Sequence, residues 1–352
     1  MDKILSKKIF LAGAEKNILS FLKKTKLTPT EKENIFLKAK KEIRRFVYSV
    51  CLGEKGEKFF LKARIMKRRE VLKQLKHEIS VYKSLNKVSK NQKLNFLFPS
   101  ILKSGKFRNI DWYLRNYREG KLAGEMMDDF SFRKNFLKNF PPKKMAEALI
   151  SLQKIPAESL GLKLYKHGGW WYLQDFNYYK QTSLKFFLAS PFNQNLLTKK
   201  EIKFAENILR NNKNFLDEKA SFLTHGDLYP NNILLTPDRE IVLLDWELMH
   251  LNNPSFDICF VWLLSKNDKK WQKDFFNLTV KNKGEEFEKL FRISLISLSI
   301  RFADACWQGL KKRRHQGYPL SSLVKSPVFS YLKFSIKIFK SALFEPKKIY
   351  DE

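Results

Sequence analysis

The sequence predicts an α+β protein, with a mixed N-terminal part built on an antiparallel sheet and a mainly helical C-terminal part. A strand-like hairpin over residues 46–63 is followed by a segment of helical spacing over 68–85. The rest of the chain has mainly helical patterns and one further hairpin. We expect a helical extension over residues 1–33, a mixed unit over 34–118 and a helical unit over 119–352. Of the 352 residues, 43% are hydrophobic, which is ample for a core.

The N-terminal elements follow from local patterns. Phe46–Leu52 and Lys58–Ala63 flank a glycine-containing turn and predict paired strands. An amphipathic helix or helix pair is expected over residues 2–24, and a proline-containing breaker over 25–30. The helix after the hairpin is indicated by apolar residues at close to helical spacing, at positions 71, 72, 75, 79, 82 and 85.

The most informative motif is His225-Gly226-Asp227, with Asn232 five residues after Asp227 and Asp245 thirteen residues after Asn232. Phosphoryl transfer to a hydroxyl needs these groups. One carboxylate orients the acceptor and takes its proton, while an amide and a second carboxylate hold Mg²⁺ on the nucleotide phosphates. Strand-like segments over 233–236 and 240–245 predict a hairpin that brings Asn232 and Asp245 together. The alternative is a polar turn followed by an ordinary hairpin.

The run from His225 to Asp245, with Asn-Pro-Ser-Phe-Asp-Ile over 253–258, resembles the aminoglycoside phosphotransferase and choline kinase family. The resemblance covers roughly residues 34–265. It implies a protein-kinase-like fold of two lobes, with an antiparallel-sheet N-lobe and a mainly helical C-lobe. It also implies a small-molecule kinase in which Asp227 is catalytic, His225 supports its loop, and Asn232 and Asp245 bind Mg²⁺.

The resemblance extends to the nucleotide site. Lys62 resembles the lysine of the third N-lobe strand, and Glu78 resembles its partner on the following helix. In kinases that lysine contacts the nucleotide phosphates and the glutamate holds it in place. Judged alone, Lys62 is one more solvated lysine in a lysine-rich chain. The segment 114–120 resembles the hinge between lobes, where backbone groups, here those of Asn116 and Tyr117, meet the adenine or guanine.

Two positions carry open alternatives. Asp257 matches a family position whose carboxylate braces the catalytic loop, or it is the N-cap of a helix that begins near Ile258, and the two roles are compatible. The phosphate-cradling loop departs from the common pattern, because no glycine occurs over 35–47. Arg44 or Arg45 would contact phosphate there, or both are surface charges. Since the other catalytic and metal-binding residues are intact, the sequence indicates an active enzyme with an unusual loop.

An aromatic cluster over residues 167–179 follows a helix expected over 145–153. In the family, insertions here shape the acceptor pocket. The Gly168-Gly169 step predicts a loop, and its aromatic side chains either stack on a sugar ring or pack the C-lobe. At the end of the preceding helix, Gln153 stands where a histidine is common in the family, which is a minor departure.

The net charge of +32 predicts non-specific attraction to polyanions, but no nucleic-acid-binding motif is present. The lysine-punctuated segment 329–344 predicts a helix packed on the C-lobe, in preference to one lying on an anionic membrane. Cationic acceptors need carboxylates or aromatic faces. The only acidic groups expected near the cleft are Asp128, Asp129 and Glu247, which favours a neutral or anionic acceptor.

Compartment is indicated by what the sequence lacks. The three cysteines follow no disulfide or zinc pattern, which indicates a reducing environment. The first ten residues are charged throughout, with no apolar core of a signal peptide, and no stretch reaches the length of a membrane span. We expect a cytoplasmic protein.

The expected function is transfer of the γ-phosphate of Mg-bound ATP or GTP to a hydroxyl of a small molecule, namely a sugar, amino sugar or amino alcohol. The alternative is a catalytically silent kinase-like scaffold that binds nucleotide or a polyanion. A protein kinase proper is disfavoured, because Asp-Trp-Glu over 245–247 replaces Asp-Phe-Gly and no Ala-Pro-Glu segment follows. The acceptor, the choice between ATP and GTP, and the oligomeric state stay open.

Overall fold

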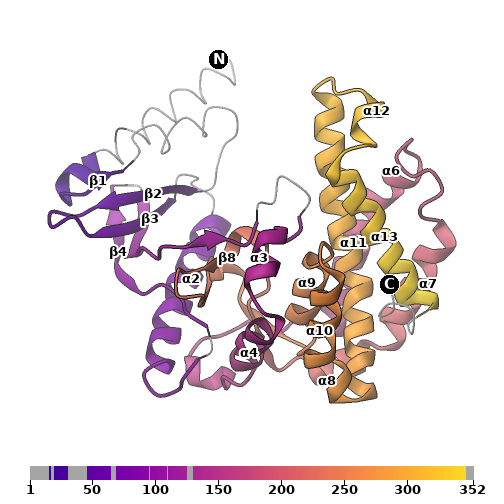
Figure 1. Cartoon of the computed structure of the whole chain (residues 1–352), viewed down its shortest axis with the longest axis horizontal. Helices are drawn as coiled ribbons and strands as arrows, with labels where there is room; N and C mark the ends of the chain where they lie inside the picture. The colour runs from indigo at the N-terminus through magenta and orange to yellow at the C-terminus, as the bar shows by residue number, and fades with distance from the viewer. Residues whose placement is uncertain are drawn as a thin grey trace. The chain divides into compact units, whose positions relative to one another are not determined.

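The computed structural model of the chain forms two compact units (Figure 1). It describes Lys16 and residues 20–30, 46–64, 69–94, 96–108, 110–124 and 130–345. Unit 1 comprises Met1–Lys93, Leu97–Glu119 and Leu244–Leu248, and unit 2 comprises Leu94–Phe96, Gly120–Leu243 and Met249–Glu352. The predicted phosphate contacts Arg44 and Arg45, the acidic pair Asp128 and Asp129, and most of the helix expected over 2–24 lie outside the described residues.

Unit 1 is built on a five-stranded antiparallel sheet in the order β1-β2-β3-β5-β4. The strands are β1 (Thr28–Pro29), β2 (Phe46–Leu52), β3 (Lys58–Arg64), β4 (Ile101–Phe107) and β5 (Ile110–Asn116). The predicted hairpin is confirmed as β2 and β3, which pair along their full length. The predicted breaker is instead in part the edge strand β1, where a proline is tolerated because the outer side of an edge strand needs no N–H donor.

The two faces of this sheet are distinct. Lys62 on β3 lies opposite Tyr113 on β5, and this face packs against helix α2 (Arg69–Val88), where the Tyr113 hydroxyl donates to Glu78 at 2.9 Å. The next positions along each strand point the other way. There Trp112 and Leu61 join a hydrophobic cluster with Phe21, from the helical turn that precedes β1. Lys62 is therefore buried on the helix-covered face.

Unit 2 is mainly helical, which confirms the α+β class. Its longest helix, α11, contacts α13, and the two run side by side (Figure 1). Its helices are α3 (Lys134–Asn139), α4 (Pro142–Gln153), α5 (Gly169–Tyr179), α6 (Lys185–Leu188), α7 (Lys199–Asn211), α8 (Lys213–Lys219), α9 (Phe256–Leu264), α10 (Lys269–Thr279), α11 (Glu285–His315), α12 (Leu320–Leu323) and α13 (Pro327–Phe344).

Helix α13 was predicted as a terminal helix packed on the C-lobe, and this is confirmed. Its apolar side chains, including Phe329, Ile336 and Phe339, are buried, whereas Lys333 and Lys337 are exposed. The apolar face therefore packs within unit 2 and is not presented to a membrane. Among the described residues, no helix combines the length and apolar character needed to cross a bilayer.

The hairpin predicted over 233–245 is confirmed as β8 (Ile233–Leu235) and β9 (Ile241–Leu243), and β8 also pairs with β6 (Lys121–Leu122). A tight turn joins β8 to β9, with the Thr236 N–H donating to the Glu240 carbonyl at 3.0 Å. The loop ahead of β8 follows β7 (Phe222–Thr224), which pairs with β10 (His250–Asn252). The hairpin thus fixes the loop that carries Asp227 and Asn232.

The loop predicted at the Gly168-Gly169 step ends there, because Gly168 is the capping residue and α5 begins at Gly169. A Cβ atom on Gly169 would collide with the carbonyl of Lys213, and one on Gly168 would collide with the Asp217 side chain. The two glycines therefore permit close packing of α5 on α8. They are needed for the approach of two helices and do not mark a flexible connection.

Candidate active site

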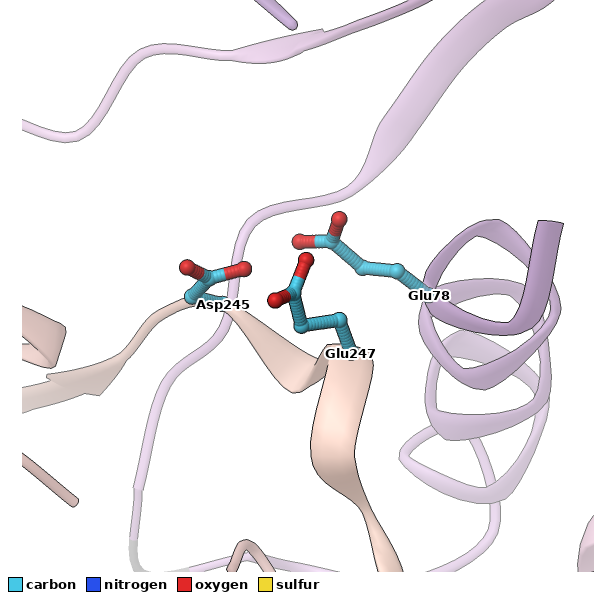
Figure 2. Close-up of side chains that lie close together, drawn as sticks. All are labelled: Glu78, Asp245 and Glu247. Carbon is cyan, nitrogen blue, oxygen red and sulfur yellow. The ribbon is translucent and has the colours of Figure 1, made fainter. Parts of the chain in front are cut away.

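A buried lysine surrounded by three carboxylates forms the charged centre of unit 1. Lys62, with 1% of its side chain exposed, donates from Nζ to Glu78 Oε2 at 2.8 Å and to Asp245 Oδ1 at 2.8 Å. Its distance to Glu247 Oε2 is 3.3 Å. Figure 2 shows the three carboxylates pointing toward one another, Glu78 from α2 and the others from the segment after β9. An ammonium has three donors, so this environment satisfies it completely.

The acidic partners keep this lysine charged in a dry site. Burial alone would favour the neutral amine, but Glu78, Tyr113 and Asp245 hold the pKa of Lys62 well above its usual value. Burial also raises the pKa of Glu78, although the charge of Lys62 opposes that rise. The solvated-lysine alternative for Lys62 is therefore wrong. The ammonium is fixed in position, as a group that neutralises phosphate charge must be.

The segment that carries Asp245 is held against α2. Asp245 has a φ of 62°, in the left-handed region that aspartate tolerates better than most residues. Its N–H donates to the Tyr82 hydroxyl at 3.3 Å, and the completely buried Trp246 follows. The short 3₁₀ helix Trp246–Leu248 then turns Glu247 toward Lys62. Glu247 was expected near the cleft but without a role at Lys62. The feature of the sequence that indicates such a role is a second carboxylate two residues after Asp245.

This carboxylate set suits a divalent cation. One oxygen from each of the three carboxylates lies within 4.8 Å of the others. Mg²⁺ takes few protein carboxylates and completes its shell with water and phosphate oxygens. Asp245 is 28% exposed, against 15% for Glu247 and 1% for Glu78. Asp245 is therefore the best placed to share an ion with phosphate, Glu247 is next, and Glu78 serves Lys62.

In unit 2, Asp257 braces the catalytic loop. Its carboxylate accepts from the N–H of His225 at 2.6 Å and from the N–H of Gly226 at 3.1 Å. The N-cap alternative is wrong, because α9 begins at Phe256 and its capping position is Ser255. Burial raises the pKa of Asp257 to about 7, and the two N–H donors oppose that rise. Gly226 has a φ of 79°, a conformation that only glycine adopts at little cost.

Asn232 fixes the carboxylate of Asp227. Its Nδ2 donates to the Asp227 backbone carbonyl at 2.8 Å and to Asp227 Oδ2 at 3.0 Å. Its Oδ1 accepts from Asn231 Nδ2 at 3.0 Å. The buried Oδ1 of Asn231 has no hydrogen-bond partner in the described structure. Buried acceptors are normally satisfied, so this oxygen and Asn232 Oδ1 fit a cation or its water ligands.

An arginine that the sequence analysis missed lies beside Asp227. Arg301 on α11 places Nη2 3.9 Å from Asp227 Oδ1, and its guanidinium carbon is 5.9 Å from the centre of the Phe260 ring. Burial opposes its charge, but Tyr229, Tyr179 and Asp227 raise the pKa of Arg301 above its usual value. The available signal was one arginine inside an otherwise apolar helical run.

Asp175 on α5 is the second missed residue. Burial raises its pKa to about 6, although Arg301 and a hydrogen bond with Tyr179 oppose the rise. Its buried Oδ2 has no hydrogen-bond partner, and neither has the buried Nδ1 of His167 just before α5. Asp175 and Asp227 both interact with Arg301, so Asp175 is an acidic group beside Asp227 that was not among those expected near the cleft, Asp128, Asp129 and Glu247. The signal was a lone aspartate in an aromatic helix.

The predicted hinge residues are engaged within unit 1. Asn116 accepts from the Ser100 N–H at 2.6 Å through Oδ1, and its own N–H donates to the Ser100 carbonyl at 3.1 Å. The Tyr117 N–H donates to the Lys58 carbonyl at 3.3 Å. A nucleotide base that contacts this segment would therefore meet groups other than these two N–H donors.

Comparison with known proteins identifies the family. The model of the phosphotransferase enzyme family matches residues 64–288, which includes α2, the catalytic loop and Asp245. No curated protein sequence matches the chain significantly.

Solved structures of similar fold include phosphotransferases and a kinase that act on small molecules. An aminoglycoside phosphotransferase, APH(2")-IIIa, solved with GDP and kanamycin, has a TM-score of 0.54 at 11% identity and covers 90% of this chain and 92% of its own. Spectinomycin phosphotransferase APH(9)-Ia, solved with ADP and spectinomycin, has a TM-score of 0.56 at 14% identity, covering 85% and 90%. Choline kinase LicA from Streptococcus pneumoniae has a TM-score of 0.50 at 13% identity, covering 84% and 89%. These likenesses show the two-lobed kinase-like fold, and the family match shows that this chain belongs to the phosphotransferase enzyme family.

Proposed function

We propose that this protein transfers the γ-phosphate of Mg-bound ATP or GTP to a hydroxyl of a sugar, amino sugar or amino alcohol in the cytoplasm. The observation that carries the proposal is the pair of prearranged sets: Lys62 fixed by three carboxylates, and Asp227 fixed by Asn232. The solved relatives support it, since their structures contain GDP with kanamycin or ADP with spectinomycin. The cytoplasmic location is supported by three buried cysteines that are all free thiols.

In this mechanism Asp227 accepts the proton of the attacking hydroxyl. Its carboxylate is oriented by Asn232 Nδ2 on one oxygen, while Arg301 lies near the other and holds negative charge in place. Lys62 neutralises phosphate charge without moving, because Glu78 fixes it. Asn232 and Asp245 would hold Mg²⁺, with Glu247 as a further carboxylate. When bound, the ion would neutralise charge on the transferred group.

The acceptor would be recognised on the Asp175 side of Asp227. Asp175 Oδ2 can accept from a hydroxyl or an amine, and the neutral His167 ring offers a second unsatisfied atom. Two carboxylates around one guanidinium make this surface locally acidic in a chain of net charge +32. This geometry admits an amino group, so it replaces the expectation of a neutral or anionic acceptor.

The test is release of ADP or GDP with Mg²⁺ against a panel of aminoglycosides, choline, hexoses and amino sugars. We expect release that depends on one acceptor class and that Asp227→Ala reduces by about 10² or more. Asp238→Ala, in the exposed turn after β8, is the matched control and should leave turnover unchanged. Nucleotide binding without release for any acceptor would contradict the proposal and favour the silent scaffold.

A further inference from the structure

A pocket around Trp112 lies on unit 1, on the sheet face opposite Lys62. It has a volume of about 630 Å³ and is formed by the turn before β1, the β2–β3 turn and parts of β3, β4 and β5. Lys62 and Tyr113 form a cross-strand pair on one face, so Trp112 and Leu114, one position away on β5, face the other. The volume is typical of small-molecule sites. Because it lies on the other face, this pocket is separate from the charged centre around Lys62.

The floor of the pocket is aromatic. Phe21, Phe59, Phe107 and Trp112 all line it, and the rings of Phe21 and Trp112 are 4.5 Å apart. Gly105 lies opposite Trp112 on β4, and a Cβ atom there would touch the indole at 3.4 Å, so the glycine leaves one face of that ring uncovered by a side chain. An apolar group would find a preformed surface here.

One hydrogen-bond donor in this floor is unsatisfied. Trp112 is only 6% exposed, and its buried Nε1–H has no hydrogen-bond partner. A buried indole N–H normally finds an acceptor. A ligand that carries an oxygen into the pocket would supply the missing acceptor.

The rim is basic. Five lysines and two glutamates line the pocket, a balance of three positive charges. Lys26 is paired with Glu54 at 2.8 Å, and Glu57 accepts from the Lys55 backbone N–H at 3.0 Å.

Within the described part of the chain, the ammonium groups of Lys24 and Lys103 form no ion pair. Lys103 lies opposite Leu114 and therefore on the Trp112 face of the sheet, and Lys24 Nζ is 5.8 Å from the centre of the Phe107 ring. These two exposed lysines are placed to bind an anionic group at the mouth of the pocket.

We propose that this pocket binds a small amphipathic anion, with its apolar body on the rings of Trp112 and Phe107, its phosphate or carboxylate group between Lys24 and Lys103, and one oxygen of that group accepting from the Trp112 Nε1–H. Neither half alone explains the site: an inorganic anion would leave the aromatic floor uncovered, and a neutral apolar ligand would leave the lysines without counter-charge. The proposal is independent of the phosphotransferase function, since it uses none of the residues of that site.

The test uses octyl phosphate as the probe and calorimetry on the full chain. Saturable binding is expected, with inorganic phosphate and octyl glucoside each binding at least about tenfold more weakly. Lys24→Glu with Lys103→Glu should weaken binding by about tenfold or more, because two charge-assisted contacts become repulsive. The matched control, Lys90→Glu with Lys93→Glu, changes two exposed lysines elsewhere in unit 1 by the same charge and should shift affinity by less than about twofold.

A second variant tests the pocket floor. Trp112→Phe keeps an aromatic ring but removes the N–H, so binding should weaken by about two- to tenfold, as expected for loss of one hydrogen bond. No saturable binding by the wild type would overturn the proposal, as would equal weakening by the control pair. Phosphatidylglycerol vesicles separate two sources of the ligand: vesicle binding that octyl phosphate competes away indicates a lipid headgroup, and octyl phosphate binding without vesicle binding indicates a soluble anion.

Discussion

At the residue scale, the site depends on a few buried charges whose partners are fixed. Lys62 would be costly to bury alone, and Glu78, Asp245 and Glu247 together offset that cost. The carboxylate of Glu78 is in turn held by the hydroxyl of Tyr113. In the proposed mechanism, the lysine would meet a nucleotide without reorganising, which is the main requirement of electrostatic catalysis.

Glu78→Gln tests this arrangement. The amide can accept one hydrogen bond from Lys62 but carries no charge, so the ammonium should be less firmly held and Mg-nucleotide should bind about tenfold more weakly. Calorimetric titration with ADP and GDP in the presence of Mg²⁺ measures this. Glu70→Gln, at an exposed position in the first turn of the same helix, is the control. Equal affinity of Glu78→Gln and wild type would contradict the role given to Glu78.

His167 provides a prediction of pH dependence. Burial, helped by the charge of Arg301, lowers its pKa from 6.5 to about 4. Between these values the unfolded chain binds a proton that the folded protein does not, so stability falls as pH decreases from about 6.5 toward 4. The loss from this residue is at most about 3 kcal/mol.

His167→Gln should remove that component. The difference in free energy of unfolding between wild type and variant, measured by urea denaturation from pH 7 to pH 4, should shift in favour of the variant as pH falls. A difference that is constant across this range would show that His167 is not buried in its neutral form.

At the element scale, sequence patterns predicted the helices and strands whose formation depends on neighbouring residues in the chain. The β2–β3 hairpin, helix α2 and the β8–β9 hairpin follow from strand alternation, helical spacing and turn residues. The loop predicted at Gly168-Gly169 is correct only for Gly168, and the start of α5 at Gly169 depends on its close packing on α8, which a local pattern does not show. Arg301 and Asp175 were missed for a similar reason. Their roles depend on which helix faces lie beside Asp227, and a local sequence pattern does not show this.

The close packing of α5 on α8 can be tested with Gly169→Ala. The added methyl group would collide with the Lys213 backbone, so we expect a loss of about 2 kcal/mol or more in the free energy of unfolding, as for other overpacked sites. Gly309→Ala is the matched control, because its Cβ would meet no atom closer than 3.9 Å and alanine favours the helix. Thermal unfolding of both variants measures this. An unchanged melting temperature for Gly169→Ala would contradict the close approach.

At the scale of the whole molecule, net charge was a poor guide to the site. The chain carries +32, yet Lys62 is surrounded by three carboxylates and Arg301 lies among Asp227 and Asp175. Part of the positive charge of the chain lies on the rim of the pocket around Trp112. A global excess of lysine is compatible with a site that holds Mg²⁺ and an amino-bearing acceptor, because screening by water and salt limits the reach of surface charges.

The most direct test of Asp227 as the group that takes the proton of the acceptor hydroxyl is the rate of a single phosphoryl transfer by Asp227→Asn. The rate is measured with Mg-nucleotide and the acceptor identified by the panel. Asparagine keeps the size of the side chain and can still accept a hydrogen bond from Asn232, but it cannot take the proton of the hydroxyl. We expect transfer to be slower by about 10² to 10⁴, with nucleotide affinity unchanged. Transfer at the wild-type rate would contradict this role of Asp227.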